Sequence, residues 1–264
     1  MKIRFLGTGG VLGAPVWNCN CKTCTSDNSK NTRFRSALFV TIGSIDILID
    51  FGQDIAQQLR INKIKKLDYA FLTHPHQDHV FGAEQLSVAE NIKLMAAPDV
   101  MMNVNANILK WLKDKNPSLT TSTEWPINIG GVEIDTVKLV HQKSYTPEYQ
   151  PCVGFLFRSP DFSFAYLSDY NDILEKHKLG DLDLIISDGN QWKDVGRGHI
   201  GVEGAINIFN ELKPKKMLLT HLSHKTEHSD IEEYLKNDKD IAPAYDGLEV
   251  QSDFIKNWDH YKGQ

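Results

Sequence analysis

The run Phe71-Leu72-Thr73-His74-Pro75-His76-Gln77-Asp78-His79 decides the fold of this chain. It places three histidines and one aspartate within six residues, directly after an apolar segment that predicts a buried strand. Side chains of this kind are costly to desolvate when they have no partner. Imidazole nitrogens together with a carboxylate suit a divalent transition metal. We therefore expect a metal site here. A solvated loop that is rich in histidine only by chance is the weaker alternative.

The bulk composition is that of an ordinary globular protein and limits the possible partners. The 264 residues are 41% hydrophobic and 24% charged, which is enough to bury a large core. The net charge of −5 gives no general attraction to polyanions, so a nucleic acid polymer is disfavoured as a partner. The first residues lack the apolar segment of a signal peptide, and no stretch approaches the ~18 apolar residues of a membrane span. We expect a cytoplasmic protein without membrane contact.

Three of the four cysteines form the pattern Cys19-x-Cys21-x-x-Cys24. Disulfides are disfavoured in a reducing compartment, and three thiolates this close in sequence suit zinc. A structural zinc takes four ligands, so this pattern leaves one ligand to be found. Two alternatives stay open: three reduced loop cysteines, or a redox-active Cys-x-x-Cys pair, which accounts for only two of the three thiols.

Several other predicted strands also end in a side chain of the metal-binding type. Residues 131–140 predict a strand that leads into a histidine, and residues 162–167, 182–187 and 216–219 predict strands that are each closely followed by an aspartate or a histidine. The side chains at these strand ends are His141, Asp169, Asp188 and His221.

Asp50 follows a predicted strand over residues 45–49 and has two possible roles. It can hydrogen-bond the metal-binding loop and so support it from behind. It can equally well cap a helix over residues 53–60.

Strands alternate with helices along the chain, and hairpins are predicted in both halves. Residues 100–112 predict one helix with an apolar stripe that faces the core. We expect a single domain, residues 1–264, in which two β-rich halves join near the polar segment 116–130. Residues 142–151 form a loop rich in Tyr and Pro beside His141, and this loop is a candidate for shaping a substrate pocket.

The spacing H-x-H-x-D-H of residues 74–79 resembles the signature of the metallo-β-lactamase superfamily. The resemblance implies an α/β (α+β) fold, the four-layer αββα sandwich, with a dinuclear metal site on loops along one edge of two sheets. The ligands it implies are His74, His76 and His141 for the first metal, Asp78, His79 and His221 for the second, and Asp169 as the bridge. Members hydrolyse phosphodiesters, thioesters, lactams and lactones, so the motif indicates the site more strongly than the substrate.

The implied site predicts a hydrolytic mechanism. Two metals ~3.5–4 Å apart can share a hydroxide and lower its pKa toward neutrality, and this hydroxide would attack a phosphorus or a carbonyl. Asp78 would take part in catalysis through the second metal. Because all the implied ligand atoms are nitrogen or oxygen, Zn²⁺, Mn²⁺ and Fe²⁺ all stay possible.

The leaving oxygen needs a proton donor, and His199 is our candidate. His199 sits on a glycine-flanked loop that is able to fold over the metals. Asp188 is the candidate to orient it. The alternative is that His199 is an ordinary loop histidine and Asp188 has no catalytic role.

Three stretches are similar to the PhnP-like phosphodiesterases, a group from the carbon–phosphorus lyase pathway. They are Gly7-Thr8-Gly9-Gly10 leading on to Trp17, the three cysteines, and Leu219-Thr220-His221-Leu222-Ser223-His224. The resemblance implies one structural Zn²⁺, and its ligands would be Cys19, Cys21, Cys24 and His224, with His228 as the fallback for the fourth. It also matches the catalytic histidine of the group to His199 and implies small phosphodiester substrates, notably cyclic ribose phosphates.

We therefore expect a metal-dependent phosphodiesterase that acts on small or cyclic phosphodiesters, with a homodimer plausible from the family. An RNase Z-like enzyme shares the site, but the chain shows no basic, glycine-rich arm for tRNA. A thioesterase or a lactonase shares the site as well. A PqqB-like metal-binding protein without turnover is the alternative from a different class.

Overall fold

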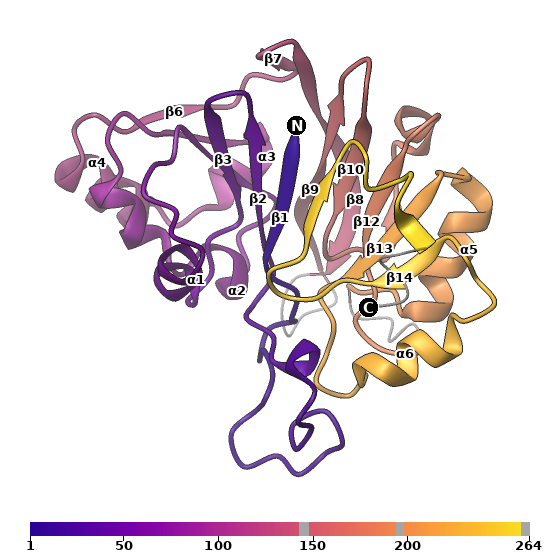
Figure 1. Cartoon of the computed structure of the whole chain (residues 1–264). Helices are drawn as coiled ribbons and strands as arrows, with labels where there is room; N and C mark the ends of the chain where they lie inside the picture. Colours follow the sequence, from indigo (N-terminus) through magenta and orange to yellow (C-terminus); the bar gives the residue numbers. More distant parts are fainter. Residues whose placement is uncertain (143–147, 194–197, 260–264) are drawn as a thin grey trace.

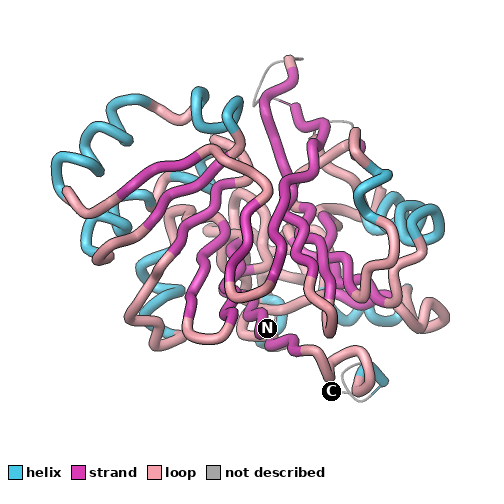
Figure 2. Tube along the Cα trace, turned by 90° about the horizontal axis from the view of Figure 1, so that it is seen from above, coloured by secondary structure: helices cyan, strands magenta, loops and turns pink. Residues whose placement is uncertain are grey.

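A computed structural model describes residues 1–142, 148–193 and 198–259. Two β-sheets lie side by side in the middle of the molecule, and helices cover the outer face of each sheet (Figure 1). Seen from above, the strands form the inner layers and the helices lie mostly on the two outer sides (Figure 2). The predicted α/β fold with four layers, αββα, is confirmed.

The first sheet collects the strands of the N-terminal half and one strand from the C-terminal end. Its strands are β1 (Lys2–Gly7), β2 (Ala37–Ile42), β3 (Ile45–Ile49), β4 (Tyr69–Leu72), β5 (Lys93–Ala96), β6 (Thr120–Ser122) and β15 (Glu249–Gln251). Within the described residues their order is β15-β1-β2-β3-β4-β5-β6. The strands from β15 to β3 pair antiparallel, whereas β3, β4, β5 and β6 pair parallel.

The second sheet repeats this plan in the C-terminal half. Its strands are β7 (Ile127–Ile129), β8 (Val132–Gln142), β9 (Tyr149–Arg158), β10 (Ser163–Leu167), β11 (Asp172–Ile173), β12 (Leu184–Asp188), β13 (Lys216–Thr220) and β14 (Ile241–Pro243). The described order is β11-β8-β9-β10-β12-β13-β14, and β7 pairs with β8. The pairs from β11 to β10 are antiparallel, and β10, β12, β13 and β14 are parallel.

The helices form the outer layers. The first sheet is covered by α1 (Ile55–Ile61), α2 (Gln77–Val80) and α4 (Ala106–Lys115), and the second by α5 (Val202–Leu212) and α6 (His228–Tyr234) (Figure 1). The helix α3 (Pro98–Asn103) contacts β5 of the first sheet and β9 of the second. Short 3₁₀ helices are η1 (Ser29–Asn31), η2 (Ala83–Val88) and η3 (Lys176–Leu179). Among the described residues, no helix has the length and apolar character that a membrane span requires.

The prediction of one helix over residues 100–112 is wrong, because the chain forms two helices there, α3 and α4. Val104 is extended, with ψ 136°. The side chain of Asn105 accepts a hydrogen bond from the N–H of Asn107 at 2.9 Å. Asparagine at this position satisfies an N–H group that the first turn of a helix leaves unpaired, so it starts a new helix instead of continuing the old one.

The main core fills the space between the sheets. The ring centroids of Phe71 on β4 and Phe155 on β9 lie 5.2 Å apart, and the Trp125 ring packs 5.2 Å from Phe71. A second cluster of buried apolar side chains lies between the second sheet and α5 and α6. The chain passes from the first sheet to the second between β6 and β7, within the segment 116–130. The single-domain organisation stays a prediction.

The fold brings the metal-binding side chains to one edge. The parallel strands β10, β12 and β13 end in turn next to Asp169, at Asp188 and next to His221, so these side chains lie at the same edge of the second sheet. The strand β4 ends at Leu72 and delivers the motif of residues 74–79 from the first sheet.

Candidate metal centre

The seven side chains predicted as ligands of the dinuclear site come together in two groups. In each group the ligand atoms all lie within 4.8 Å of one another. The first group is His74, His76, His141 and Asp169, and the second is Asp78, His79, Asp169 and His221. Asp169 belongs to both, as expected of a bridging carboxylate. That these groups bind metal stays a prediction. The predicted loop 142–151 has wrong bounds, because Gln142 belongs to β8 and residues 149–151 belong to β9, where Gln142 pairs with Tyr149. Residues 143–147 lie outside the described residues, so the role of this segment stays a prediction.

In the first group, ring nitrogens with lone pairs face one another. The Nδ1 of His141 donates to the carbonyl oxygen of Gly198 at 2.7 Å, and the Nδ1 of His74 lies 2.9 Å from the hydroxyl of Thr73. Each of these histidines therefore presents an Nε2 lone pair to the centre. These Nε2 atoms lie 3.1 Å (His74) and 2.9 Å (His141) from Nδ1 of His76. One ring proton cannot satisfy three such atoms, whereas a cation between them can.

Gly198 holds His141 at close range. Its φ is +94°, a conformation that favours glycine, and a Cβ added there would lie 2.7 Å from Nδ1 of the His141 ring. The residue next to Gly198 is His199, so the same turn orients a predicted metal ligand and carries the predicted proton donor.

In the second group, histidine ring nitrogens face carboxylate oxygens at short range. The Nδ1 of His79 donates to Asp50 at 2.8 Å. Its Nε2 is buried and has no hydrogen-bond partner of good geometry among the described residues, yet it lies 3.3 Å from Asp169 Oδ2 and 3.6 Å from Asp78 Oδ2. The Nε2 of His221 lies 3.2 Å from the same oxygen of Asp169. Nitrogen and carboxylate atoms this close need a proton or a metal cation between them.

The charges of the second group favour such a cation. Burial by itself lowers the pKa of His79, but Asp169, Asp50 and Asp78 together raise it well above its ordinary value. Burial likewise acts to raise the pKa of Asp78, but His79 and His221 lower it to about 2. The three carboxylates thus make the potential at the His79 ring negative. The residues present fit a divalent metal, and their nitrogen and oxygen donors are compatible with zinc, manganese and iron(II).

The predicted pairing of His199 with Asp188 is present. The Nδ1 of His199 donates to Asp188 Oδ2 at 2.8 Å, and the Asp188 side chain is fully buried at the end of β12. Burial lowers the pKa of His199, but Asp188 raises it to about 9. The imidazole stacks on that of His221, with ring centroids 4.9 Å apart and an interplanar angle of 11°. The loop histidine thus lies directly against the second ligand group.

The three cysteines surround His224. The Nδ1 of His224 lies 3.5 Å from the sulfur of Cys19 and 3.6 Å from those of Cys21 and Cys24. A tetrahedral zinc with Zn–S ~2.3 Å and Zn–N ~2.0 Å would separate sulfur from nitrogen by about 3.5 Å. The fallback residue His228 is not in this group, because its Nε2 faces Glu232 at 3.2 Å.

The chemistry of the four cysteine-site side chains also fits a zinc ion. Burial acts to raise the pKa of Cys21, but hydrogen bonds from the Cys24 backbone and from His224 lower it to about 6. Burial, together with the neighbouring thiols, raises the pKa of Cys24 to about 11. The cluster therefore resists full ionisation by itself, and a bound cation relieves the repulsion between thiolates. The N–H of Val16 donates to the sulfur of Cys24 at 3.2 Å.

A cleft of about 200 Å³ adjoins the second ligand group. It lies between the Gly10–Gly13 turn, Asn190 and Gln191, and the segment that carries His224 and Lys225. A Cβ added to Gly10 would lie 3.3 Å from the ring of His221, so the turn borders the candidate metal centre. Lys225 is the cationic side chain among the residues that line this cleft.

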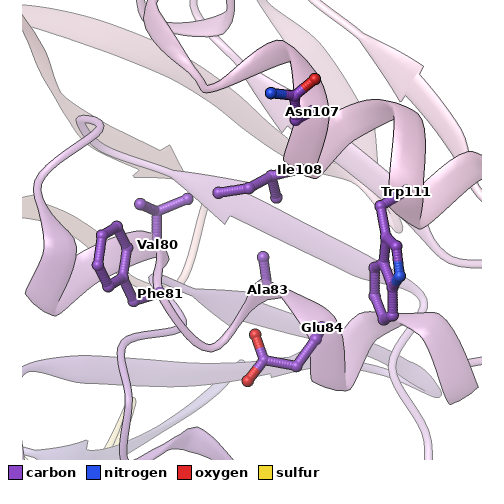
Figure 3. Close-up of a pocket in the computed structure, with 7 residues that line it drawn as sticks. All are labelled: Val80, Phe81, Ala83, Glu84, Asn107, Ile108 and Trp111. Carbon is purple, nitrogen blue, oxygen red and sulfur yellow. The ribbon is translucent and has the colours of Figure 1, made fainter.

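A larger pocket of about 450 Å³ opens beyond α2. Figure 3 shows Phe81 and Trp111 on opposite sides of it, with Glu84 at its edge. The remaining lining residues are Val80, Ala83, Asn107 and Ile108. The pocket is almost entirely apolar and contains none of the predicted metal ligands.

Sequence reasoning missed two side chains that support the ligands. The hydroxyl of Thr73 joins His74 to Asp50, which lies 2.9 Å from it. The amide of Asn190 donates to the carbonyl oxygen of His221 at 3.1 Å. Thr73 directly precedes His74 in the metal-binding motif, so its position could have indicated that it supports this ligand. Asn190 is separated from His221 by 31 residues and gave no signal.

Comparison with known proteins gives the class of this protein. The family model of the β-lactamase superfamily domain matches residues 46–222, and the chain belongs to this superfamily. Its members include metal-dependent hydrolases, which agrees with the side chains gathered at the site.

Particular relatives differ in what they do. An octanoyltransferase of Porphyromonas gingivalis (strain ATCC BAA-308 / W83) is 27% identical over 95% of this chain, and the chain spans about half, 51%, of its length. A solved diphosphatase from the PhnP family is 24% identical, with TM-score 0.82, over 94% of this chain and 96% of that one. Zn²⁺-bound PqqB from Methylobacterium extorquens is 18% identical, with TM-score 0.83, over 95% of this chain and 100% of that one. The similarity to the PhnP family noted from sequence thus extends to the fold.

Proposed function

We propose that this protein is a dinuclear metal-dependent hydrolase of small or cyclic phosphodiesters, diphosphate esters included. The observation that carries the proposal is the His199–Asp188 pair, which lies against two ligand groups that share Asp169. A proton donor beside two metal positions is what phosphoester hydrolysis needs when the leaving group is a poor one. The likeness to a PhnP-family diphosphatase supports the choice of substrate.

The protein side chains have distinct tasks in this mechanism. When bound, two divalent metals supply positive charge that activates water and stabilises the negative charge developing on the phosphoryl oxygens. Asp188 fixes Nδ1 of His199, so the imidazole can deliver a proton to the leaving oxygen from Nε2. His141 and His79 keep their orientation through Gly198 and Asp50. Asp78 belongs to the second ligand group and completes the catalytic set with His199 and Asp188.

The surroundings favour a small substrate. The cleft between Gly10 and Lys225 has about 200 Å³, which suits a sugar or a second phosphate better than a polymer. The net charge of −5 also disfavours an extended nucleic acid. We assign Mn²⁺ or Zn²⁺, with Fe²⁺ as a further option, to the catalytic groups and one Zn²⁺ to the cysteine group, in a protein that acts without membrane contact and as a homodimer.

Two other functions have a specific observation in their favour. The match to a protein named octanoyltransferase, although it covers half of that protein, supports hydrolysis of an acyl thioester by the same centre. The likeness to PqqB over its full length supports a metal-binding protein without turnover.

A panel of substrates separates these functions. Protein purified without chelator would receive Mn²⁺ or Zn²⁺, and its turnover of each compound would be measured. The compounds are bis-p-nitrophenyl phosphate, a cyclic ribose phosphate, a 2′,3′-cyclic nucleotide, a diphosphate ester, a tRNA precursor, an octanoyl thioester and a lactone. We expect turnover of the small phosphoesters. Turnover confined to the thioester, lactone or tRNA precursor would overturn the proposed substrate class. Absence of turnover of every compound, with metals bound, would favour the PqqB-like role.

A further inference from the structure

Arg33 is a charged side chain buried at the base of the segment between β1 and β2. It is 2% exposed, and its guanidinium donates to the uncharged oxygens of Lys30 (backbone), Ser223 (backbone) and Asn31 (side chain). Burial lowers its pKa to about 10, although Asp246 and Glu227 act in the opposite direction. Arg33 therefore stays charged at neutral pH. A buried charge of this kind is costly, so its hydrogen bonds must be satisfied by the protein.

Those hydrogen bonds reach the short segment between the two candidate metal sites. The Nη1 of Arg33 donates to the carbonyl oxygen of Ser223 at 2.9 Å. Ser223 lies between His221, which belongs to the second ligand group, and His224, which belongs to the cysteine group. One guanidinium thus fixes the peptide that joins a predicted catalytic ligand to a predicted structural ligand.

The second terminal nitrogen of the guanidinium, Nη2, is linked through hydrogen bonds to the segment that follows the cysteine group. Its Nη2 donates to Asn31 Oδ1 at 3.0 Å, and the same oxygen accepts the N–H of His228 at 2.9 Å. The amide of Asn31 donates to the hydroxyl of Ser26 at 2.9 Å and to the carboxylate of Glu227. Ser26 follows Cys24 by two residues. Arg33 therefore contacts, directly or through Asn31, the segments on both sides of the cysteine group.

The rest of the joining segment is held just as firmly. The N–H of Leu222 donates to the carbonyl oxygen of Thr8 at 2.7 Å. The N–H of Ser223 donates to the backbone carbonyl oxygen of Asn190 at 2.8 Å. The Ser223 oxygen that accepts from Arg33 also accepts from the hydroxyl of Thr226 at 2.8 Å. A shift of His224 is thereby passed to His221 through a backbone with little freedom to absorb it.

We propose that Arg33 is a positioning residue that couples the cysteine site to the second catalytic metal position. Metal at the cysteine site would fix the position of His224. The hydrogen bond from Arg33 holds the Ser223 peptide in place, so His221 is held in its binding position. Metal binding at one site then raises the affinity of the other, and the effect is reciprocal. The inference rests on the proposal that both groups bind metal.

The test measures metal affinity and needs no substrate. Mn²⁺ prefers nitrogen and oxygen ligands to thiolates, so it reports the catalytic groups in protein that already carries one Zn²⁺ at the cysteine site. Its dissociation constants would be followed by electron paramagnetic resonance of free Mn²⁺. The variants are Cys24→Ser, Arg33→Met, the double variant, and Arg33→Lys as a version that keeps the charge.

We expect the weaker of the two Mn²⁺ sites to lose about tenfold in affinity in Cys24→Ser and in Arg33→Met alike. The double variant should lose no more than either single variant, because both remove the same coupling. Arg33→Lys should recover part of the loss. Arg35→Met is the matched control, since Arg35 lies in the same segment but pairs with Asp54 at 3.0 Å and donates to Val11 at 2.9 Å. It should leave the tenfold effect of Cys24→Ser unchanged.

The outcomes distinguish the two proposals. Unchanged Mn²⁺ affinity in both Arg33 variants, or losses that add in the double variant, would overturn the coupling while leaving the metal sites in place. Wild-type protein that binds no Mn²⁺ or Zn²⁺ at these groups would overturn the proposed function together with the coupling.

Discussion

The carboxylate of Asp50 accepts a hydrogen bond from Nδ1 of His79 at 2.8 Å. It also accepts from the backbone N–H of Thr73 at 2.9 Å and lies 2.9 Å from the Thr73 hydroxyl. These contacts decide between the two roles that the sequence allowed. The helix α1 begins at Ile55 with Asp54 at its N-cap position, so Asp50 is not its cap. Asp50 instead holds the metal-binding loop from behind.

Asp50→Asn should weaken metal binding without unfolding the protein. An amide has about the same size but no charge, and it cannot accept from His79 and Thr73 as strongly as a carboxylate does. Loss of such a partner typically costs about 10–100-fold in metal affinity. Metal affinity would be measured by competition with a chelating dye. Asp54→Asn is the matched control, because Asp54 pairs with Arg35 on the surface and should leave the affinity unchanged. Equal affinities in all three proteins would refute the role of Asp50.

His199→Ala should lower kcat by about 10²–10⁴ on a phosphodiester with a poorly activated leaving group, because a general acid contributes about that much. An activated leaving group such as p-nitrophenolate needs little protonation, so most of the loss should disappear with it. The ratio of the two kcat values would be compared between wild type and variant. His177→Ala, at an exposed histidine on η3, is the control. A loss of the same size on both substrates would mean that His199 does not donate the proton.

Cys21→Ser should lower the melting temperature and the zinc content more than it alters the chemistry. The Cys21 sulfur lies 3.6 Å from His224 Nδ1, as a shared zinc requires, and a structural zinc contributes directly to folding. Calorimetry and elemental analysis would give the two values. Cys152→Ala offers a comparison, because Cys152 is a buried thiol outside the cysteine group. A melting temperature unchanged by Cys21→Ser would argue against a structural zinc.

Lys225→Met should raise KM for a diphosphate ester by about tenfold and leave kcat and KM for bis-p-nitrophenyl phosphate nearly unchanged. Lys225 lines the cleft beside Gly10, and only the diphosphate ester carries a second anionic group that could reach it. Steady-state kinetics on both substrates would measure the split. Lys213→Met removes the same charge from an exposed position at the end of α5 and should change neither. If KM for the diphosphate ester stays constant in Lys225→Met, the cleft does not bind this group.

The resemblance to the superfamily predicted the grouping of the candidate ligands, and each of them lies at or shortly after the end of a strand. The carboxyl ends of parallel strands share one edge, and the pattern His74 to His79 fixed which edge carries the site. The three thiols could be matched to His224 only through the resemblance to the PhnP-like group.

Contacts between distant segments could not be predicted. Arg33 and Ser223 are separated by 190 residues, and nothing in the local pattern around Arg33 differs from a surface arginine. The helix break at Asn105 depends on one side-chain hydrogen bond that competes with continued helix formation. The substrate is equally hidden, because the cleft beside Gly10 is lined by loop residues from three separate parts of the chain.

The two-metal mechanism is tested most directly by titrating chelator-treated protein with Mn²⁺ while hydrolysis of bis-p-nitrophenyl phosphate is followed, in wild type and in Asp78→Ala. Asp78 lies in the second ligand group only, so its removal should leave the first group intact. We predict that wild-type activity rises until two Mn²⁺ are bound per active site, and that Asp78→Ala keeps its fold but stays at background at every Mn²⁺ concentration. Full activity with one Mn²⁺, or retained turnover in Asp78→Ala, would contradict the dinuclear mechanism.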